Sequence, residues 1–456
     1  MKRPNILFLM SDEHRADVTG YEGNSIIRTP NLDRLAGTGV VFRNAYTPSP
    51  ICIPGRQAIM AGQLPRTCKS EVYGQDLAPG YMTFARLFSQ YAYTTTACGK
   101  LHHTGTDQLQ GWTTRVGGDV SIGSSYIQDK QQDEFNAFAN FKKSVKWSDA
   151  KEVKRAGIGK GPGYVKDQYT LQGALDFIES YFCDPYHDRP QPEKPLMLKV
   201  SLIQPHYPYL ANEREFTYYL NRVQPYLDQK VSDHPFLSSR QVVPGIDASV
   251  REIRRATAAY YGMIEQIDQR YGVVLDALEN VGQDLDDWII IYTSDHGEML
   301  GQHGIWEKQK FYEASARVPL IIRWPKGFDG GRVVNENVNL CDLFATLCDL
   351  AGIPTPSGLD SRSLVPLIND DAGGWNNETV SQFGKRNLMI KRDNLKYQYY
   401  GEDMPEVLFD LSKDSDENIN FIDCQEYEEV LKQFRQRRGE LGFGPNADPC
   451  YVNAGY

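Results

Sequence analysis

The stretch Cys52-Ile53-Pro54-Gly55-Arg56 places a thiol and a guanidinium on either side of a proline at a predicted helix start. Pro54 suits the first turn of a helix because it lacks an N–H group that would be unpaired there. A helix start exposes amide donors and partial positive charge, so an anionic group is favoured beside Cys52. Taken alone, the same residues could be a buried thiol behind a loop proline, so the interpretation depends on the rest of the chain.

Further groups of ionisable residues each follow directly after an apolar segment that is typical of a buried strand. They are Asp12-Glu13 after 5–10, Lys100 and His102 after 93–97, His206 after 195–203, and Asp295-His296 after 288–293. The carboxyl ends of strands are where α/β sheets place their sites. The sequence therefore predicts that these side chains gather around Cys52.

The cationic and titratable residues in these groups suit an anionic substrate. Lysine supplies a compact positive charge, and histidine exchanges a proton near neutral pH. Simpler explanations remain open, because Glu13 could lie in an exposed acidic turn and a lone loop histidine such as His206 is more often an ordinary residue.

Taken together, these motifs resemble the type I sulfatases of the alkaline phosphatase superfamily, whose C-x-P-x-R motif matches Cys52 to Arg56. In that family a maturation enzyme oxidises the cysteine to formylglycine, and the hydrated aldehyde is the nucleophile. The resemblance implies one divalent cation held by Asp12, the modified Cys52, Asp295 and His296. Ca²⁺ is the expected ion, with Mg²⁺ or Mn²⁺ as alternatives.

The resemblance also implies catalytic roles for five cationic or titratable residues. The family has a G-K-x-H motif that Lys100 and His102 match, and a later lysine at the position of Lys308. Arg56, Lys100 and Lys308 would offset the charge of the sulfate. His206 or Lys308 would protonate the departing alcohol, and His102 would accept the proton of the second formylglycine hydroxyl, which expels sulfate.

Three residues beside these motifs are left without an assigned role. Glu13 stands where the family usually has a second aspartate and is longer by a methylene, so its role as a ligand is open. His103 follows His102 directly and could belong to a surface turn. Lys310 is treated as a bystander to Lys308.

The predicted function is a sulfatase that hydrolyses sulfate monoesters, with a sulfated saccharide as the expected substrate. The Asp295-His296 pair is more similar to choline sulfatases, iduronate-type sulfatases and phosphonate hydrolases than to the Asp-Asn arylsulfatases. A phosphonate monoester or phosphodiester hydrolase, a choline sulfatase, or a binding protein in which Cys52 stays a thiol are the alternatives. Two polar segments, 104–163 and 210–248, are expected to wall the pocket, with Trp112 as one wall.

The elements that must position these residues predict an α/β fold. We expect a large, mostly parallel sheet between helices, as in alkaline phosphatase, and a small C-terminal antiparallel sheet. A helix capped by Thr29 and a strand over 40–46 complete a strand-helix-strand unit that leads to Cys52. The catalytic domain is expected to span 1–367 and the C-terminal α+β subdomain 368–456.

The composition argues against several classes of function. The net charge of −10 disfavours nucleic-acid or membrane binding, and the eight cysteines show neither zinc-like spacing nor a disulfide framework. The first apolar run is too short for a signal peptide or a membrane span, so a cytoplasmic location is expected, or a periplasmic one if a leader was removed. The expected partners are a small anionic sulfate ester and the maturation enzyme, and a homo-oligomer is left open.

Overall fold

Alternate side chains of strand β1 (Asn5–Asp12) serve two separate hydrophobic cores, because successive residues of a strand point to opposite faces of a sheet. Ile6 and Phe8 belong to the core on one face, and Leu7 and Leu9 belong to the core on the other. Both faces of the central sheet are therefore covered. The computed structural model describes residues 3–117, 119, 150–183 and 194–444 of the chain.

The central sheet has eight strands in the order β10-β2-β9-β8-β1-β6-β3-β4. Besides β1, these are β2 (Val40–Tyr46), β3 (Thr94–Gly99), β4 (Thr114–Val116), β6 (Leu196–Pro205), β8 (Trp288–Ser294), β9 (Leu320–Arg323) and β10 (Arg332–Asn339). Every strand runs parallel to the others except β9, which is antiparallel to both β8 and β2. The predicted mostly parallel sheet is confirmed.

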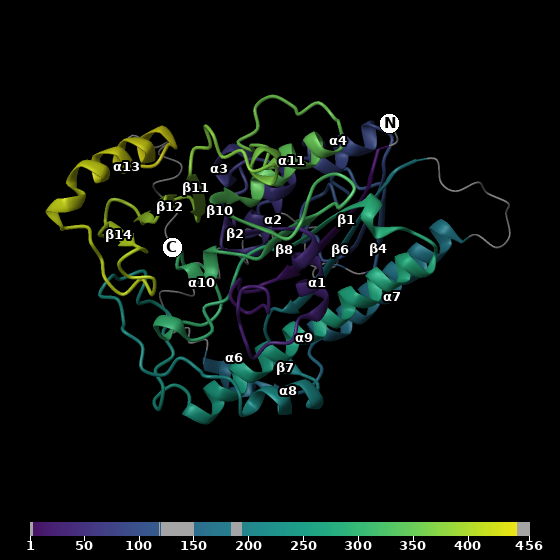
Figure 1. Cartoon of the computed structure of the whole chain (residues 1–456). Helices are drawn as coiled ribbons and strands as arrows, with labels where there is room; N and C mark the ends of the chain where they lie inside the picture. The colour runs from purple at the N-terminus through teal and green to yellow at the C-terminus, as the bar shows by residue number, and fades with distance from the viewer. Residues whose placement is uncertain (1–2, 118, 120–149, 184–193, 445–456) are drawn as a thin grey trace.

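Helices cover both faces of this sheet (Figure 1). One face carries α1 (Pro30–Thr38), α7 (Pro162–Phe182) and α9 (Val250–Asn280), and the other carries α2 (Cys52–Ala61), α4 (Phe84–Gln90), α11 (Leu343–Leu350) and α12 (Val365–Ile368). The α9 helix starts with a capping box, in which Ser249 accepts a hydrogen bond from the backbone of Glu252 while the Glu252 side chain accepts one from Ser249. Thr29 makes no such side-chain cap for α1 and instead accepts a hydrogen bond from Gly20 N at 2.8 Å.

The segment from β1 through α1 to β2 differs from a simple strand-helix-strand unit. The two strands run parallel, but β8 and β9 lie between them in the sheet. These two intervening strands come from residues 288–323, so their insertion depends on long-range pairing. The strand β2 is followed directly by α2, whose first residue is Cys52.

A third core lies between α9 and the segments that the sequence indicated to be irregular. It is built on α6 (Ala150–Arg155), β7 (Leu210–Ala211) and α8 (Glu213–Leu220), and β7 pairs with the short strand β5 (Gly157–Ile158). The expected pocket wall at Trp112 is wrong, because this ring is 1% exposed and packs edge-on against Phe84 at 5.9 Å. Residues 118 and 120–149 of the first polar segment lie outside the described residues.

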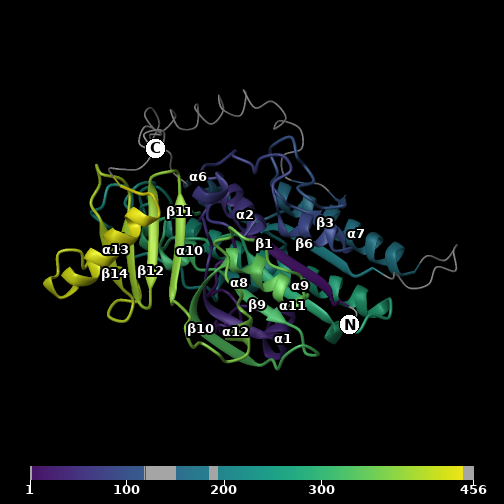
Figure 2. The ribbon, with the colours of Figure 1, turned by 90° about the horizontal axis from the view of Figure 1, so that it is seen from above.

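The C-terminal part is a four-stranded antiparallel sheet with one helix (Figure 2). Its elements are β11 (Glu378–Phe383), β12 (Asn387–Arg392), β13 (Leu395–Tyr399), β14 (Val407–Asp410) and α13 (Glu428–Glu440). The helix covers one face, where Phe434 stacks on Tyr397 at 5.5 Å. The other face packs on the part of the chain that holds the central sheet, through residues such as Met389 and Phe409, which share a core with Tyr46.

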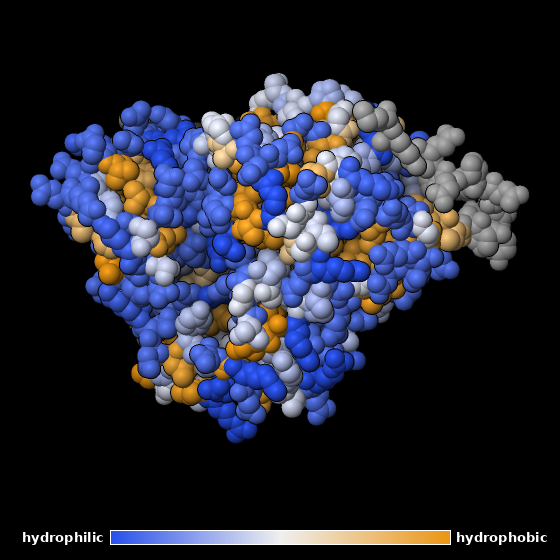
Figure 3. Space-filling view, viewed as in Figure 1, coloured by the Kyte–Doolittle hydropathy of each residue, from blue (hydrophilic) through white to orange (hydrophobic). Residues whose placement is uncertain are grey.

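The remaining short elements lie in connections between these layers. They are α3 (Pro65–Cys68), α10 (Glu313–Ala316), η1 (Leu285–Asp287), η2 (Gln302–Gly304), η3 (Leu340–Asp342) and η4 (Gln425–Tyr427). The face seen in Figure 3 is mostly hydrophilic, with apolar residues in separate patches. Within the described ranges, no helix combines the length and the apolar character that a membrane span requires.

Candidate functional site

Cys52 is the first residue of α2, so it lies where the helix exposes its unpaired amide groups. Ile51, in an extended conformation, is the cap residue, and its carbonyl accepts the first helical hydrogen bond from Gly55 N at 3.0 Å. A Cβ atom at Gly55 would lie 2.9 Å from Ser49 O and 3.5 Å from Asp295 O. The missing side chain at this position therefore lets the start of α2 approach the end of β8.

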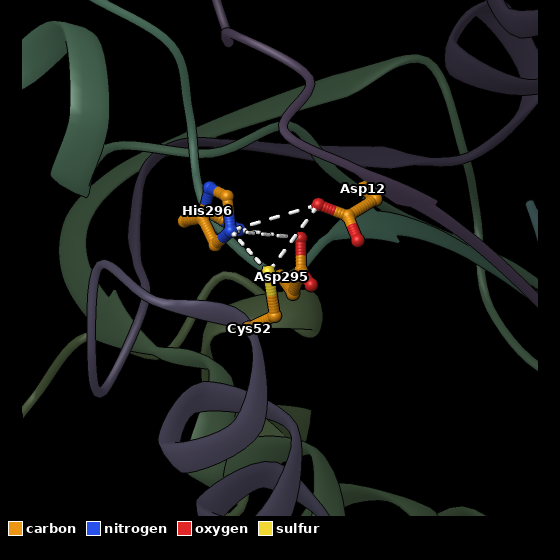
Figure 4. Close-up of side chains that lie close together, drawn as sticks. All are labelled: Asp12, Cys52, Asp295 and His296. Carbon is orange, nitrogen blue, oxygen red and sulfur yellow. Dashed lines mark hydrogen bonds and ion pairs between the residues drawn. The ribbon is translucent and has the colours of Figure 1, made fainter. Parts of the chain in front are cut away.

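Four side chains from three strand or helix ends converge on one buried point (Figure 4). The Cys52 Sγ atom lies 3.2 Å from His296 Nε2 and 3.7 Å from Asp12 Oδ1. His296 Nε2 lies 3.6 Å from Asp12 Oδ1 and 3.7 Å from Asp295 Oδ1. Each of these residues is at most 2% exposed. The structure thus brings the four predicted ligands within reach of a single ion.

The His296 ring is oriented as a metal ligand requires. Its Nδ1 atom lies 3.0 Å from the Gly297 carbonyl oxygen, which can only accept a hydrogen bond, so Nδ1 carries the proton. The lone pair of Nε2 is therefore directed at the cluster. Burial lowers the pKa of His296 to about 3, so the ring is neutral at neutral pH. Two carboxylate oxygens and a neutral imidazole fit a divalent cation.

Arg56 ties the cluster to the rest of the site. Its Nε atom donates to Asp295 Oδ2 at 2.6 Å, and Nη1 donates to the Lys100 carbonyl at 2.8 Å and to Ser201 Oγ at 2.9 Å. Burial alone would raise the pKa of Asp295, but the Arg56 charge beside it holds that pKa well below its usual range. Asp295 is therefore a carboxylate throughout the neutral range.

Lys100 follows β3 and forms an ion pair with Asp12 inside the site. Burial lowers the pKa of Lys100 to about 8, although nearby Asp295 opposes this shift. Burial also raises the pKa of the Cys52 thiol to about 12, so an unmodified Cys52 is protonated at neutral pH. An unmodified Cys52 is thus a weak nucleophile.

Lys308, Glu13 and His206 form a second group beside the cluster. The Lys308 ammonium lies 2.9 Å from Glu13 Oε2 and 2.7 Å from His206 Nε2. His206 Nδ1 donates to its neighbour's carbonyl, Tyr207 O, at 2.7 Å, so Nε2 is free to accept from Lys308. Burial and the Lys308 charge lower the pKa of His206 well below its usual range. Burial raises the pKa of Glu13, and the Lys308 charge beside it opposes this shift. The group is an ammonium held between the Glu13 carboxyl group and a neutral imidazole.

His102 is buried beside the exposed Tyr73. Its Nε2 atom is 3.3 Å from Tyr73 Oη, and the two rings meet edge-on at 5.6 Å. The His102 backbone is fixed by its N–H, which donates to Asp119 Oδ2 at 2.8 Å. Burial, with the Lys100 charge, lowers the pKa of His102 well below its usual range. The ring is therefore neutral and can accept a proton.

Two of the three residues that the sequence left without a role, His103 and Lys310, bind other parts of the chain. His103 Nδ1 bonds the Gln108 carbonyl at 3.0 Å. The Lys310 ammonium contacts Phe236 O and donates to Ser239 Oγ at 2.7 Å. Both side chains thus bind groups of other segments, at residues 108 and 236–239.

Sequence reasoning missed several residues that shape the site. Glu298 accepts from Leu300 N at 2.8 Å and Glu307 N at 2.6 Å, and so holds the loop that carries Lys308. Ser201 binds Arg56, and Tyr73 reaches His102 from a separate loop. The position of Glu298 in Ser294-Asp295-His296-Gly297-Glu298 was a usable signal, whereas nothing in the sequence around Tyr73 marked it.

Comparison with known families matches two parts of the chain. The sequence model of the Sulfatase family matches residues 4–353. A second model, described as N-sulphoglucosamine sulphohydrolase, C-terminal, matches residues 301–442. Together the two matches extend from the first strand to the end of the C-terminal helix.

Similar proteins support the same family. An arylsulfatase of Clostridium perfringens is 31% identical over 95% of this chain and 93% of its own length. A choline-sulfatase of Rhizobium meliloti is 30% identical over 92% of this chain and 83% of its own length.

Solved structures share the fold. A phosphonate monoester hydrolase of Agrobacterium radiobacter has a TM-score of 0.77 at 22% identity, with 96% of this chain and 95% of that chain covered. A protein in complex with its substrate D-glucosamine-2-N,6-O-disulfate has a TM-score of 0.75 at 21% identity, with 96% and 97% covered. At such low identity these two likenesses concern the fold alone. The family match over most of the chain and the relative at 31% identity show that the chain belongs to the sulfatase family, a family of sulfuric ester hydrolases.

Proposed function

We propose that this protein hydrolyses sulfate monoesters with a formylglycine made from Cys52 and one divalent cation held by Asp12, Asp295, His296 and the modified Cys52. The observation that carries the proposal is the convergence of these four side chains at the start of α2, with Arg56 and Lys100 in direct contact with the two carboxylates. The donor set favours Ca²⁺ or Mg²⁺, and the imidazole also admits Mn²⁺.

The cationic side chains suit a sulfate ester. The formylglycine hydrate would supply the attacking hydroxyl and the divalent cation would supply positive charge beside it. Arg56, Lys100 and Lys308 would offset the charge of the sulfate oxygens and the charge that develops during transfer. Because all three are buried, this charge acts in a medium of low polarity and is preorganised by the contacts described above.

Two histidines are suited to the proton transfers. The Lys308 ammonium donates to His206 Nε2, so Lys308 can protonate the leaving oxygen directly or by passing its proton through His206. His102 has a neutral ring, and its buried Nδ1 atom has no hydrogen-bond partner among the described residues. We propose that His102 accepts the proton of the second formylglycine hydroxyl, the step that releases sulfate.

A sulfated saccharide is the proposed substrate. Tyr73 is 45% exposed next to His102, so it offers one accessible aromatic face on which a sugar ring can pack. A quaternary ammonium prefers a cage of several rings, and the Tyr207 ring already faces the Lys308 ammonium at 4.9 Å. The family model that matches the C-terminal part carries the description of an N-sulphoglucosamine sulphohydrolase, a name that refers to a sulfated sugar.

Two alternatives keep the same nucleophile and cation. A choline sulfatase is favoured by the relative at 30% identity that bears this name. A phosphonate monoester or phosphodiester hydrolase is favoured by the shared fold of such an enzyme. Tetrahedral oxyanions of sulfur and phosphorus fit similar pockets. These functions are therefore separated by comparing the rates of hydrolysis of the different substrates.

The test has two stages. The protein is produced with a formylglycine-generating maturation enzyme, and peptide mass spectrometry measures the conversion of Cys52. Release of sulfate is then compared for sulfated mono- and disaccharides, choline sulfate and an aryl sulfate, alongside hydrolysis of a phosphonate monoester. We expect conversion, preference for a saccharide, and no turnover by Cys52→Ala. Full activity with an unmodified thiol would refute the nucleophile, and preference for choline sulfate or a phosphonate would refute the substrate.

A further inference from the structure

We propose that Glu13 is a positioning residue that holds the Lys308 ammonium against His206, and that it is not a ligand of the divalent cation. The inference rests on the proposed function in one respect, since it assigns Glu13 a part in the departure of the leaving group through Lys308. It concerns a carboxylate for which neither the motif nor the family comparison gives a role.

The geometry of the three side chains carries the inference. Glu13 Oε2 lies 2.9 Å from Lys308 Nζ and 3.6 Å from His206 Nε2, while Nζ and Nε2 are 2.7 Å apart. The Glu13 side chain is fully buried and that of Lys308 is 6% exposed. A carboxylate hydrogen bond to an ammonium is among the strong kinds, more so where water is excluded. Glu13 therefore fixes one side of the ammonium and His206 the other.

The backbone of Glu13 sets the direction of its side chain. The residue has φ of 68°, a left-handed conformation that is strained for a residue with a side chain. It is held there at both ends, because Glu13 N donates to Asp295 Oδ1 at 3.1 Å and Glu13 O accepts from Tyr260 Oη at 2.7 Å. Through the first contact, the backbone amide of Glu13, and not its carboxylate, faces the proposed cation ligand Asp295.

A second group of possible metal ligands, which includes Glu13, also supports a positioning role for this residue. Oxygens of Asp12 and Glu13 and a nitrogen of His206 lie close enough to hold an ion. Two of these three, however, already bind the Lys308 ammonium. The group that satisfies this second cluster is thus a positive charge that the chain itself supplies.

A lysine needs such a support because its stem is long and flexible. Lys308 has four rotatable methylene groups, and a freely moving ammonium would be aligned with a leaving oxygen for a small part of the time. With Glu13 in place, the ammonium keeps one orientation before substrate arrives. The extra methylene of glutamate relative to aspartate lets the carboxylate reach past Asp12 to Lys308.

The test compares Glu13→Gln with wild type on two aryl sulfates. Nitrophenyl sulfate has a leaving group that departs without a proton, whereas phenyl sulfate has one that needs it. We expect Glu13→Gln to lower kcat/KM for phenyl sulfate by on the order of tenfold more than for nitrophenyl sulfate. In a Lys308→Ala background the same change is expected to add no more than about twofold, because its effect acts through Lys308. Metal per chain, from elemental analysis, stays at the wild-type value.

Controls separate this role from a general loss of stability. Glu265→Gln removes a buried glutamate whose side chain pairs with Arg28 at 2.7 Å, and it should leave the ratio between the two esters unchanged. If Glu13→Gln does not fold, Glu13→Asp is measured in the same way. Aspartate keeps the negative charge, but its shorter side chain holds the carboxylate farther from Lys308.

Three results would overturn the inference. They are loss of bound metal in Glu13→Gln, an equal loss on both esters, and additive losses with Lys308→Ala. If wild type releases no sulfate from any ester, the proposed function falls, and a crystal structure of Glu13→Gln decides the role of Glu13. Displacement of Lys308 Nζ from His206 Nε2 would then support it, and an unmoved ammonium would contradict it.

Discussion

His296 and His206 acquire different roles through the same local device. In each ring Nδ1 donates to a backbone carbonyl of the next residue, Gly297 O at 3.0 Å and Tyr207 O at 2.7 Å. Each Nε2 therefore presents a lone pair toward the site. For His296 that lone pair faces the proposed divalent cation, and for His206 it faces the Lys308 ammonium. The neighbours of each ring, rather than the residue type, decide what it binds.

Replacing Asp295 by Asn tests the cation site at this scale. Asp295 directs one oxygen at the cluster and the other at Arg56, at 2.6 Å. Loss of the negative charge should remove the bound metal and leave Arg56 with a weaker partner. We expect kcat/KM for sulfate release to fall by on the order of a hundredfold or more. Elemental analysis and turnover measure the two effects.

Asp286→Asn is the matched control for this change. Asp286 lies just before β8, is half-exposed and pairs with Arg323 at the surface. It should retain both metal and activity, because surface ion pairs contribute little. Full metal content with wild-type turnover in Asp295→Asn would show that the cation, if bound, lies elsewhere.

At the scale of elements, the connection between β8 and β9 is the least regular part of the site. Leu300, His303, Glu307 and Gln309 all have positive φ values, between 52° and 76°. Such residues persist where surrounding contacts hold them. Glu298 provides those contacts, because its carboxylate accepts from two backbone amides of this connection and from Tyr209 Oη at 3.0 Å. The position of Lys308 thus depends on one buried carboxylate.

We predict that Glu298→Ala lowers the free energy of unfolding and kcat/KM together, whereas Glu298→Gln is tolerated far better. The Ala variant leaves two amides of the connection without their acceptor, at about 1–3 kcal/mol for each buried group. The Gln variant keeps an amide oxygen for those donors. Urea unfolding and sulfate release measure the outcome. Equal losses in both variants would mean that the charge, and not the acceptor, is what the connection needs.

Strand ends could be predicted from the sequence because each combines a local apolar run with a polar group. The residues expected at them, such as Asp12, Asp295 and His296, do meet in space. The order of strands could not be predicted, since it depends on pairing between residues far apart in the chain. The β10 and β11 strands were missed because their residues, such as Asn335-Glu336-Asn337, are more polar than those of a typical buried strand.

Other parts of the site depend on tertiary contacts that leave no local pattern. Trp112 lies in a polar segment, and its burial against Phe84 follows from the packing of β4 beside β3 and α4. Glu13 was recognised as a departure from the family motif, but its partner Lys308 is 295 positions away. Contacts of this kind require the fold before they can be seen.

At the scale of the whole molecule, a buried charge network joins the C-terminal sheet to the catalytic part. Lys396 of β13 binds Glu313 of α10 at 2.6 Å and Glu417 at 2.7 Å. Tyr46, at the end of β2, donates to Glu313 at 2.9 Å, and Glu417 accepts from the Glu313 backbone at 2.6 Å. The strand that leads to Cys52 is thereby linked to the C-terminal sheet, so the packing of this sheet supports the position of Cys52.

Because of this network, the free energy of unfolding depends on pH. Burial raises the pKa of Glu417 from 4.5 to about 7, with Lys396 opposing and Glu313 adding to the shift. The folded state therefore binds more protons than the unfolded state between these values, and the free energy of unfolding falls as pH rises across this window. Burial opposes the shift at Glu313, but Lys396 lowers the pKa of Glu313 to about 2, so Glu313 changes charge below the window.

Glu417→Gln should remove this part of the pH dependence. Gln cannot ionise, and its single oxygen can still accept from either the Glu313 amide or Lys396, which bind different oxygens of Glu417. Relative to the variant, wild type should lose up to about 1 kcal/mol per pH unit between about pH 4.5 and 7 and nothing further above. Urea unfolding across this range measures the difference, with Glu428→Gln, an exposed residue of α13, as a control that should follow wild type. Identical profiles for wild type and Glu417→Gln would mean that Glu417 is ionised throughout, and the network would then bind the subdomain as a permanently charged cluster.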